Sequence, residues 1–232
     1  MWYLSKGGYM EKIIGVIPDL HIPGQVSYAL EFIRDTFSDH RVTDVICIGD
    51  LVDHHYISFH NNELDADNPI DEWRKAKLEL MRWVKAFPKM KLCSGNHDER
   101  NVRAAKIVGL PEDIYLKKIN DVYDLPSEWR WRTRWDVDKV IYEHGVGSSG
   151  MYGAKNTALK LGSAYVQGHT HAHAAVFDIV QARTRFAGMN VGALIDKDKY
   201  QARYAKNIFK TEMSLGCGIV YAPDSMRFIP FK

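Results

Sequence analysis

Cysteine is scarce in this sequence of 232 residues. The three that occur, Cys47, Cys93 and Cys217, are odd in number, widely separated and without any CxxC pair. This spacing excludes a zinc knuckle and a disulfide framework. Cys47 and Cys93 lie in apolar runs, where a thiol behaves as a small core residue, so we expect a structural role for them.

The sequence also lacks an excess of one charge and any long hydrophobic run. Its formal net charge of +2 is too small to indicate a nucleic-acid partner by itself. The first residues, MWYLSKGGYMEK, contain no apolar signal-peptide core, and no run approaches the length of a membrane span. We therefore expect a cytoplasmic protein with no membrane partner.

No internal repeat, low-complexity segment or flexible linker divides the chain. Apolar residues make up 46% and charged residues 26% of the sequence, which is typical of a globular protein that buries a core without disulfides. We predict one domain over residues 1–232, with 1–11 as a flexible tail. Residues 54–70 and 114–137 are expected to be insertions beside a pocket.

Short β-rich runs alternate with helical stretches along much of the chain. Strands are predicted at 12–18, 44–48, 89–93, 139–142 and 164–167, and helices at 26–39, 71–87, 99–108 and 152–161. From residue 174 the chain is predicted to be mainly β, ending in strands 218–222 and 226–230. This alternation indicates an α/β layered domain.

Polar clusters stand immediately after the predicted strands. They are Asp19-Leu-His21, Gly49-Asp50-Leu-Val-Asp53, Gly95-Asn96-His97-Asp98, His144-Gly145 and Gly168-His169-Thr-His171. Side chains at the carboxyl ends of neighbouring strands converge on one rim of a sheet, and glycines permit the tight turns needed there. The clusters are therefore expected to form one site.

The side chains in these clusters are typical metal ligands. Asp, Asn and His without thiolate suit Mn, Fe, Zn or Ni. A catalytic site with one metal ion needs only three protein ligands, whereas at least seven candidates point to this rim. The sequence therefore predicts two ions that share a bridging carboxylate.

The order of the clusters resembles the calcineurin-like metallophosphoesterase family, including its small bacterial and phage members. The family pattern is DxH, GDxxD, GNH(D/E), a later His and GHxH, and every element is present here between Asp19 and His171. The resemblance implies a four-layer α/β/β/α sandwich of mixed sheets, with the dimetal site at the strand carboxyl ends. Periodicity alone supports only the α/β layering.

The resemblance also implies a role for each motif residue. One ion would be held by Asp19, His21, Asp50 and His171, and the other by Asp50, Asn96, His144 and His169. Mn is expected, with Fe, Zn and Ni as alternatives. A metal-bridging hydroxide would attack phosphorus, His97 would assist the leaving group, and Asp53 would orient the imidazole of His97.

Several residues outside the ligand set have two interpretations. His54 and His55 either line the pocket or are structural, and Arg100 either contacts the substrate phosphate or only begins a helix. Residues 129–135 alternate Trp and Arg, which favours one strand with a buried tryptophan face over a cationic wall for nucleic acid. The basic stretch Lys199–Lys210 favours a solvated helix face over an arm for a partner.

The expected function is hydrolysis of a phosphodiester in a nucleotide or nucleic acid. Protein Ser/Thr phosphatases of the family carry Asp-Arg-Gly where this chain has Asp53-His54-His55, and the missing arginine removes a usual phosphate clamp. The main alternative is a phosphomonoesterase on the same two ions. A non-catalytic scaffold is disfavoured because no ligand of the family pattern is missing.

Overall fold

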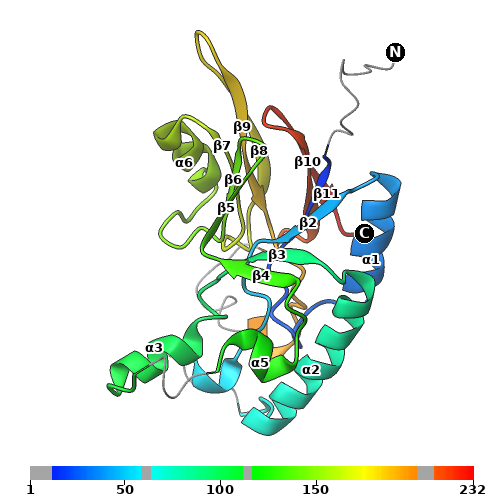
Figure 1. The fold of residues 1–232 in the computed structure, drawn as a ribbon, viewed down its shortest axis with the longest axis vertical. Coiled ribbons are helices and arrows are strands. Elements are labelled where there is room, and N and C mark those ends of the chain that lie inside the picture. The colour runs from blue at the N-terminus through cyan, green and yellow to red at the C-terminus, as the bar shows by residue number, and fades with distance from the viewer. Residues whose placement is uncertain (1–11, 59–63, 112–116, 203–211) are drawn as a thin grey trace.

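The computed structural model describes residues 12–58, 64–111, 117–202 and 212–232. Within them, two mixed β-sheets lie face to face, and helices cover their outer faces (Figure 1). These layers confirm the predicted α/β/β/α sandwich. The predicted tail 1–11 lies outside the described residues. No helix in the described ranges is both long enough and apolar enough to cross a membrane.

The first sheet has the strand order β11-β10-β1-β2-β3-β4. Its central strands run parallel, and β10 and β11 are antiparallel additions at one edge. The bounds are β1 Ile14–Ile17, β2 Asp44–Cys47, β3 Met90–Cys93, β4 Trp129–Arg132, β10 Gly216–Ala222 and β11 Ser225–Pro230.

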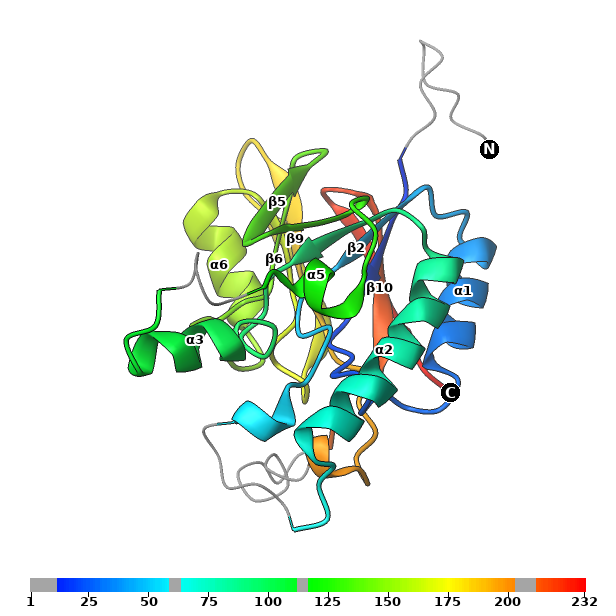
Figure 2. The ribbon, with the colours of Figure 1, turned by 60° about the horizontal axis from the view of Figure 1, so that its bottom comes forward.

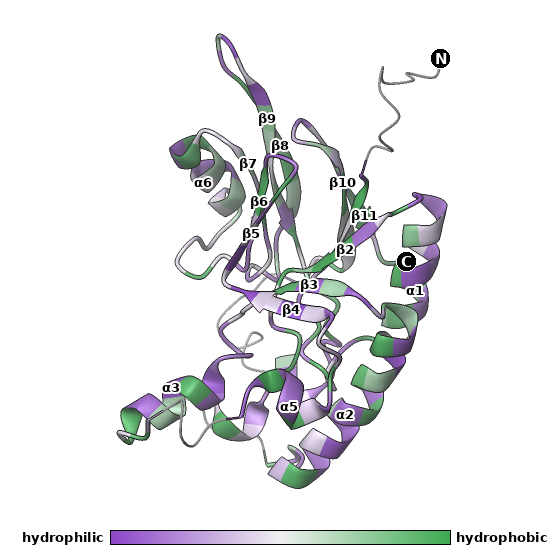
Figure 3. Cartoon of the chain, viewed as in Figure 1, coloured by the Kyte–Doolittle hydropathy of each residue, from purple (hydrophilic) through white to green (hydrophobic). Residues whose placement is uncertain are grey.

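Helices α1 (Ala29–Asp39) and α2 (Pro69–Ala86) pack on the outer face of this sheet (Figure 2). Both helices carry hydrophobic and hydrophilic residues side by side in Figure 3, as expected for helices with one face on a sheet. Asn68 explains why α2 begins earlier than predicted: its side chain accepts hydrogen bonds from the backbone N–H groups of Ile70 and Asp71.

The second sheet has the strand order β5-β6-β7-β9-β8, with parallel pairing in the middle and antiparallel pairs at both edges. The bounds are β5 Arg134–Val137, β6 Val140–Glu143, β7 Ala164–Gln167, β8 Ala174–Val180 and β9 Arg185–Val191. Helix α6 (Gly153–Leu161) covers its outer face through Ala154 and Ala158.

Buried strands explain how the two sheets share one core. Along β1, Ile14 and Val16 belong to the cluster between the sheets, whereas Ile17 belongs to the cluster under α1 and α2. All four residues of β1 are buried, which is why this strand reads as a continuous apolar run rather than an alternating one. Central strands of this kind hold the loops at their carboxyl ends in fixed positions.

The prediction of a single strand over residues 129–135 is wrong. Trp129 begins β4, which pairs with β3 in the first sheet, whereas Trp135 lies in β5, which pairs with β6 in the second sheet. The chain crosses between the sheets at Thr133. Alternation has the same period in both sheets, so it does not report the crossing. Trp129 and Trp135 are buried, Trp131 is half-buried and the intervening arginines are exposed, so the core interpretation holds fully for two of the three tryptophans.

Three short elements lie near the carboxyl ends of the parallel strands: η1 (His55–Ile57), α3 (Arg100–Ile107) and α5 (Ile119–Tyr123). The first falls in the predicted insertion 54–70, of which residues 59–63 are outside the described part. The described part of 114–137 contains α5 as well as the sheet strands β4 and β5. Most of Lys199–Lys210 is also outside the described residues.

Candidate metal centre and active site

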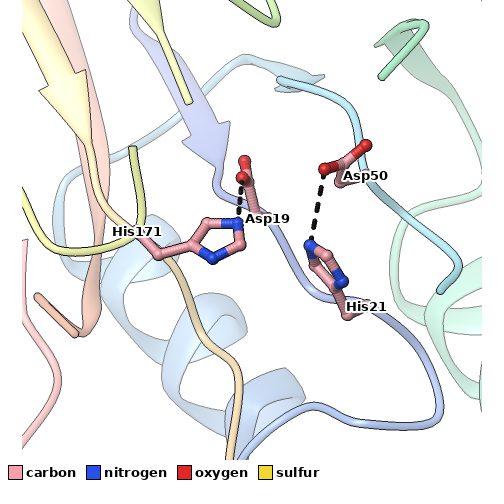
Figure 4. Close-up of side chains that lie close together, drawn as sticks. All are labelled: Asp19, His21, Asp50 and His171. Carbon is pink, nitrogen blue, oxygen red and sulfur yellow. Dashed lines mark ion pairs between the residues drawn. The ribbon is translucent and has the colours of Figure 1, made fainter. Parts of the chain in front are cut away.

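The structure brings all seven predicted ligands together at one rim of the two sheets. The loops after β1, β2 and β3 come from the first sheet, and those after β6 and β7 come from the second. Asp19, His21, Asp50 and His171 offer ligand atoms that all lie within 4.8 Å of one another (Figure 4). Two pairs face each other there, His171 Nε2 at 2.9 Å from Asp19 Oδ2 and His21 Nε2 at 3.4 Å from Asp50 Oδ2.

The other predicted ligands also gather around Asp50. His144 Nε2 lies 3.2 Å from Asp50 Oδ2 and 3.1 Å from Asn96 Oδ1. The ring of His169 lies 5.1 Å from that of His144. Asp50 thus contacts histidines of both predicted ligand sets, which is the position that a bridging ligand requires.

One carboxylate oxygen of Asp53 contacts two histidines at once. Its Oδ1 accepts from His21 Nδ1 at 2.6 Å and from His97 Nδ1 at 2.8 Å, and the carboxylate is 1% exposed. Asp53 therefore makes the predicted orienting contact with His97 and a second contact with His21, a predicted metal ligand. Carboxylates that orient ligating histidines in this way fix the tautomer and the direction of the free ring nitrogen.

Two motif glycines allow the carboxylates to approach the neighbouring loops. A Cβ on Gly95 would collide with Oδ1 and the backbone nitrogen of Asp50, and a Cβ on Gly168 would collide with Oδ1 of Asp19. Neither glycine has a positive φ, so close approach is the reason for glycine at both positions. The hydrogen bond from His169 N to Asp19 Oδ2, at 2.9 Å, shows how tightly the loops fit.

Four site residues adopt the left-handed conformation that side chains other than glycine rarely take. Their φ angles are 49° for His21, 49° for Asp50, 51° for His54 and 65° for His169. Such residues cluster at functional sites, where surrounding contacts hold the strain. Here the contacts include His21 N to Asp50 O at 3.0 Å and His97 N to Asp50 Oδ1 at 2.8 Å.

Burial and mutual charge shift the pKa values of the cluster strongly. Burial lowers the pKa of His21, but Asp50 and Asp53 outweigh it and raise this pKa to about 10. The pKa of His144 is likewise raised to about 9, because Asp50 and Asp19 outweigh burial. In return, the histidines hold the pKa of Asp50 and of Asp53 well below the usual range, against the effect of burial. The metal-free centre therefore holds imidazolium and carboxylate groups in contact.

His97 has the opposite environment. Burial first, and then the positive charge of His21, lower the pKa of His97 to about 4. Its ring packs edge-on to that of His21, with 4.1 Å between the ring centroids. His97 is therefore neutral near pH 7, with Asp53 at its Nδ1.

The three candidate substrate-binding residues are all buried, and each is engaged by the protein. His54 contacts the carbonyl of His97 through Nδ1 at 3.2 Å and the hydroxyl of Tyr123 through Nε2 at 3.0 Å. The ring of His55 lies against Tyr200 with 4.8 Å between centroids. Arg100 is 5% exposed and turned toward Asp53 and His97. Pocket lining by His54 and His55, and a substrate contact of Arg100, stay predictions.

Two supporting residues of the site, Glu72 and Tyr123, were not predicted from the sequence. Glu72, on α2, accepts from the backbone N–H groups of His55 at 2.8 Å and Tyr56 at 3.2 Å. Burial raises the pKa of this carboxyl to about 7. A signal was present, since Glu72 lies four residues before Ala76 and therefore on the buried stripe of α2. Tyr123 had no such signal.

Asp98, the last residue of the Gly95-Asn96-His97-Asp98 motif, binds two backbone N–H groups with its carboxylate. Its two oxygens accept from the backbone N–H groups of Val52 at 3.2 Å and Gly95 at 2.9 Å. Burial, and then the charge of Asp50, raise the pKa of Asp98 to about 7. Asp98 therefore ties the loop after β2 to the loop after β3.

Unsatisfied buried atoms test whether the residues fit metal ions. Asp19 Oδ1 and His21 Nε2 are buried and have no hydrogen-bond partner among the described residues. A buried polar atom without such a partner is costly unless something else satisfies it. Both are oxygen or imidazole donors, which suit divalent ions of the first transition series. Both atoms belong to the predicted ligand set of one ion, so the residues of that set fit a divalent ion.

The fold and this cluster define an α/β protein with a candidate metal centre at its strand ends. The family model of the calcineurin-like phosphoesterases matches residues 13–173, and the chain belongs to that family. The match includes all five motifs, and it supports a phosphoesterase hydrolase in general terms.

Solved structures with similarity to the chain include two vacuolar protein sorting 29 proteins. The one from Cryptosporidium parvum has a TM-score of 0.47 and 10% identity, with 94% of this chain and 95% of that chain covered. The one from Chaetomium thermophilum has a TM-score of 0.37 and 16% identity, with coverages of 80% and 74%. Similarities of this size say nothing about function. A comparison with curated proteins finds no match.

Proposed function

We propose that the chain hydrolyses a phosphodiester, in a nucleotide or a nucleic acid, with two divalent metal ions. The observation that carries this proposal is the buried or half-buried ligand cluster around Asp50, next to the His97–Asp53 pair. Asp19, His21, Asp50 and His171 would hold one ion, and Asp50, Asn96, His144 and His169 the other. Mn is the first candidate, with Fe, Zn and Ni as alternatives.

Bound divalent ions would supply a water of lowered pKa and neutralise charge on the phosphoryl oxygens. The protein residues hold and orient the reacting groups. Asp53 fixes the ring of His97 through Nδ1, so Nε2 is the nitrogen on the side of Asp50, at 4.0 Å from Asp50 Oδ2. The neutral ring keeps its proton on Nδ1, toward Asp53, so Nε2 must take up a proton before His97 can donate to the departing oxygen.

The preference for diesters is supported by the surroundings of Asp53. His54 stands where protein phosphatases of the family have an arginine, and its ring is buried against Tyr123. The guanidinium of Arg100 is nearby, but it is engaged by backbone carbonyls. A monoester dianion needs more cationic contact than a diester monoanion, so this arrangement favours the diester.

The decisive experiment is an assay of chelator-treated protein with bis-p-nitrophenyl phosphate and p-nitrophenyl phosphate, each metal being restored singly. We expect diester hydrolysis that returns with Mn and falls by about 100-fold or more in His97→Asn. A strong preference for the monoester would establish the phosphomonoesterase instead. No turnover with any metal, despite binding of two ions, would favour a scaffold role.

Metal affinity is expected to rise with pH. The pKa values of His21, about 10, and His144, about 9, lie above the ordinary value of 6.5, so protonated rings stabilise the metal-free fold below about pH 6.5. That stabilisation is lost as the pH rises through 9 and 10. Ligation requires neutral imidazole, so binding of Mn must release protons.

Titration calorimetry in two buffers of different ionisation enthalpy measures this release directly. We expect tighter Mn binding, and a larger metal-induced rise in Tm, at about pH 8.5 than at about pH 6.5. Equal affinity at both values would show that the two rings are already neutral in the metal-free protein.

A further inference from the structure

Arg100 is an almost fully buried arginine at the first position of α3, with 5% of its surface exposed. An arginine cannot lose its charge in a protein, so burial of its guanidinium is costly unless its donors are satisfied. The contacts that satisfy Arg100 therefore indicate what the residue does. None of them is explained by the helix that Arg100 begins.

The guanidinium of Arg100 contacts the loop after β2, which carries Asp53, and the loop after β3, which carries His97. Its Nη1 donates to the backbone carbonyl of Asp53 at 2.7 Å and to that of His54 at 3.3 Å. Its Nη2 donates to His97 Nε2 at 3.2 Å. The ring of His97 is thus contacted at both nitrogens, by Asp53 at Nδ1 and by Arg100 at Nε2.

We infer that Arg100 is a positioning residue, which braces the His97 ring against the loop that carries Asp53. The two contacts of Nη1 to backbone carbonyls anchor the guanidinium independently of His97. Because Nη2 can only donate, Nε2 is an acceptor in this arrangement and must take up a proton before it can serve the leaving oxygen. The two carbonyl contacts keep the guanidinium anchored when that proton displaces Nη2 from the ring. This inference rests on the proposed function and assigns no substrate contact to Arg100.

Arg100→Lys, Arg100→Ala and Arg103→Ala form the test, assayed with a series of aryl phosphodiesters of graded leaving-group pKa. Lysine keeps the charge but not the planar fork, and Arg103 is an exposed arginine one turn further along α3. We expect both Arg100 variants to lose about 100-fold in kcat with little change in KM, and to lose most on the poorest leaving groups. Guanidinium added to Arg100→Ala should restore part of the rate, and Arg103→Ala should behave as wild type.

A rise in KM at unchanged kcat would overturn the inference, because it would show a substrate contact. Equal loss on all leaving groups would overturn it as well, since a general structural defect acts on every substrate alike. Nuclear magnetic resonance of the 15N-labelled His97 ring in metal-free protein provides a readout that does not need activity. If wild type hydrolyses nothing, the proposed function fails, whereas a changed Nε2 signal in Arg100→Ala still supports the brace and an unchanged signal overturns it.

Discussion

Asp50→Asn is expected to reduce metal-dependent hydrolysis to below about 1% of the wild-type rate. Loss of a residue that only orients a metal ligand costs about 10- to 100-fold, and Asp50 is itself the proposed ligand of both ions. The substitution also removes a negative charge that contacts His21 and His144 at 3.4 Å and 3.2 Å. Turnover with restored Mn and the number of ions bound in calorimetry are the measurements.

The matched control is Asp178→Asn. Asp178 lies on β8, is exposed and pairs with Arg185 at 3.3 Å, so its loss should leave hydrolysis and ion binding unchanged. Thermal unfolding of metal-free Asp50→Asn shows whether the variant folds. Wild-type turnover in a folded Asp50→Asn protein would mean that the catalytic centre lies elsewhere.

The position of the metal cluster could be predicted because it depends on local rules. Each motif follows a buried strand, and parallel strands place their carboxyl ends at one edge, so Asp19, Asp50 and Asn96 had to meet. The same rule brought His144 and His171 to this rim as if all the strands formed one sheet, whereas they follow β6 and β7 of the second sheet. No periodicity shows that a second sheet stacks on the first with its strand ends at the same rim.

The supporting contacts could not be predicted because they depend on side-chain direction across distant elements. Arg100 begins a helix, and its position in the sequence does not tell whether the side chain points to solvent or to the interior. Its direction depends on the loop after β2, whose carbonyls it contacts. Tyr123 reaches His54 from a five-residue helix that carries no motif. The crossing between the sheets at Thr133 could not be predicted either, because it depends on how the two sheets stack.

Gly95→Ala is expected to lower hydrolysis by about 100-fold or more in a protein that still folds. The added Cβ would meet the buried carboxylate of Asp50 and also its backbone nitrogen, which cannot move aside as a flexible side chain could. The loop after β3 must therefore move, and it carries Asn96 and His97. A displacement of about 1 Å at a reacting group costs about 100-fold in rate. The kcat of the diester assay and the metal affinity measure the effect.

Gly162→Ala is the control variant. It shows what replacing a glycine far from the site does to stability and activity. Gly162 ends α6 with a φ of 63° and has nothing within 4 Å of the Cβ position, so alanine there costs about 1–3 kcal/mol of stability through backbone strain. We expect this control to unfold at a lower temperature with unchanged kcat. Gly95→Ala, in contrast, should lose mainly kcat and still fold. If Gly95→Ala keeps full activity, the two loops are free to separate, and close approach to Asp50 is not what requires glycine in this motif.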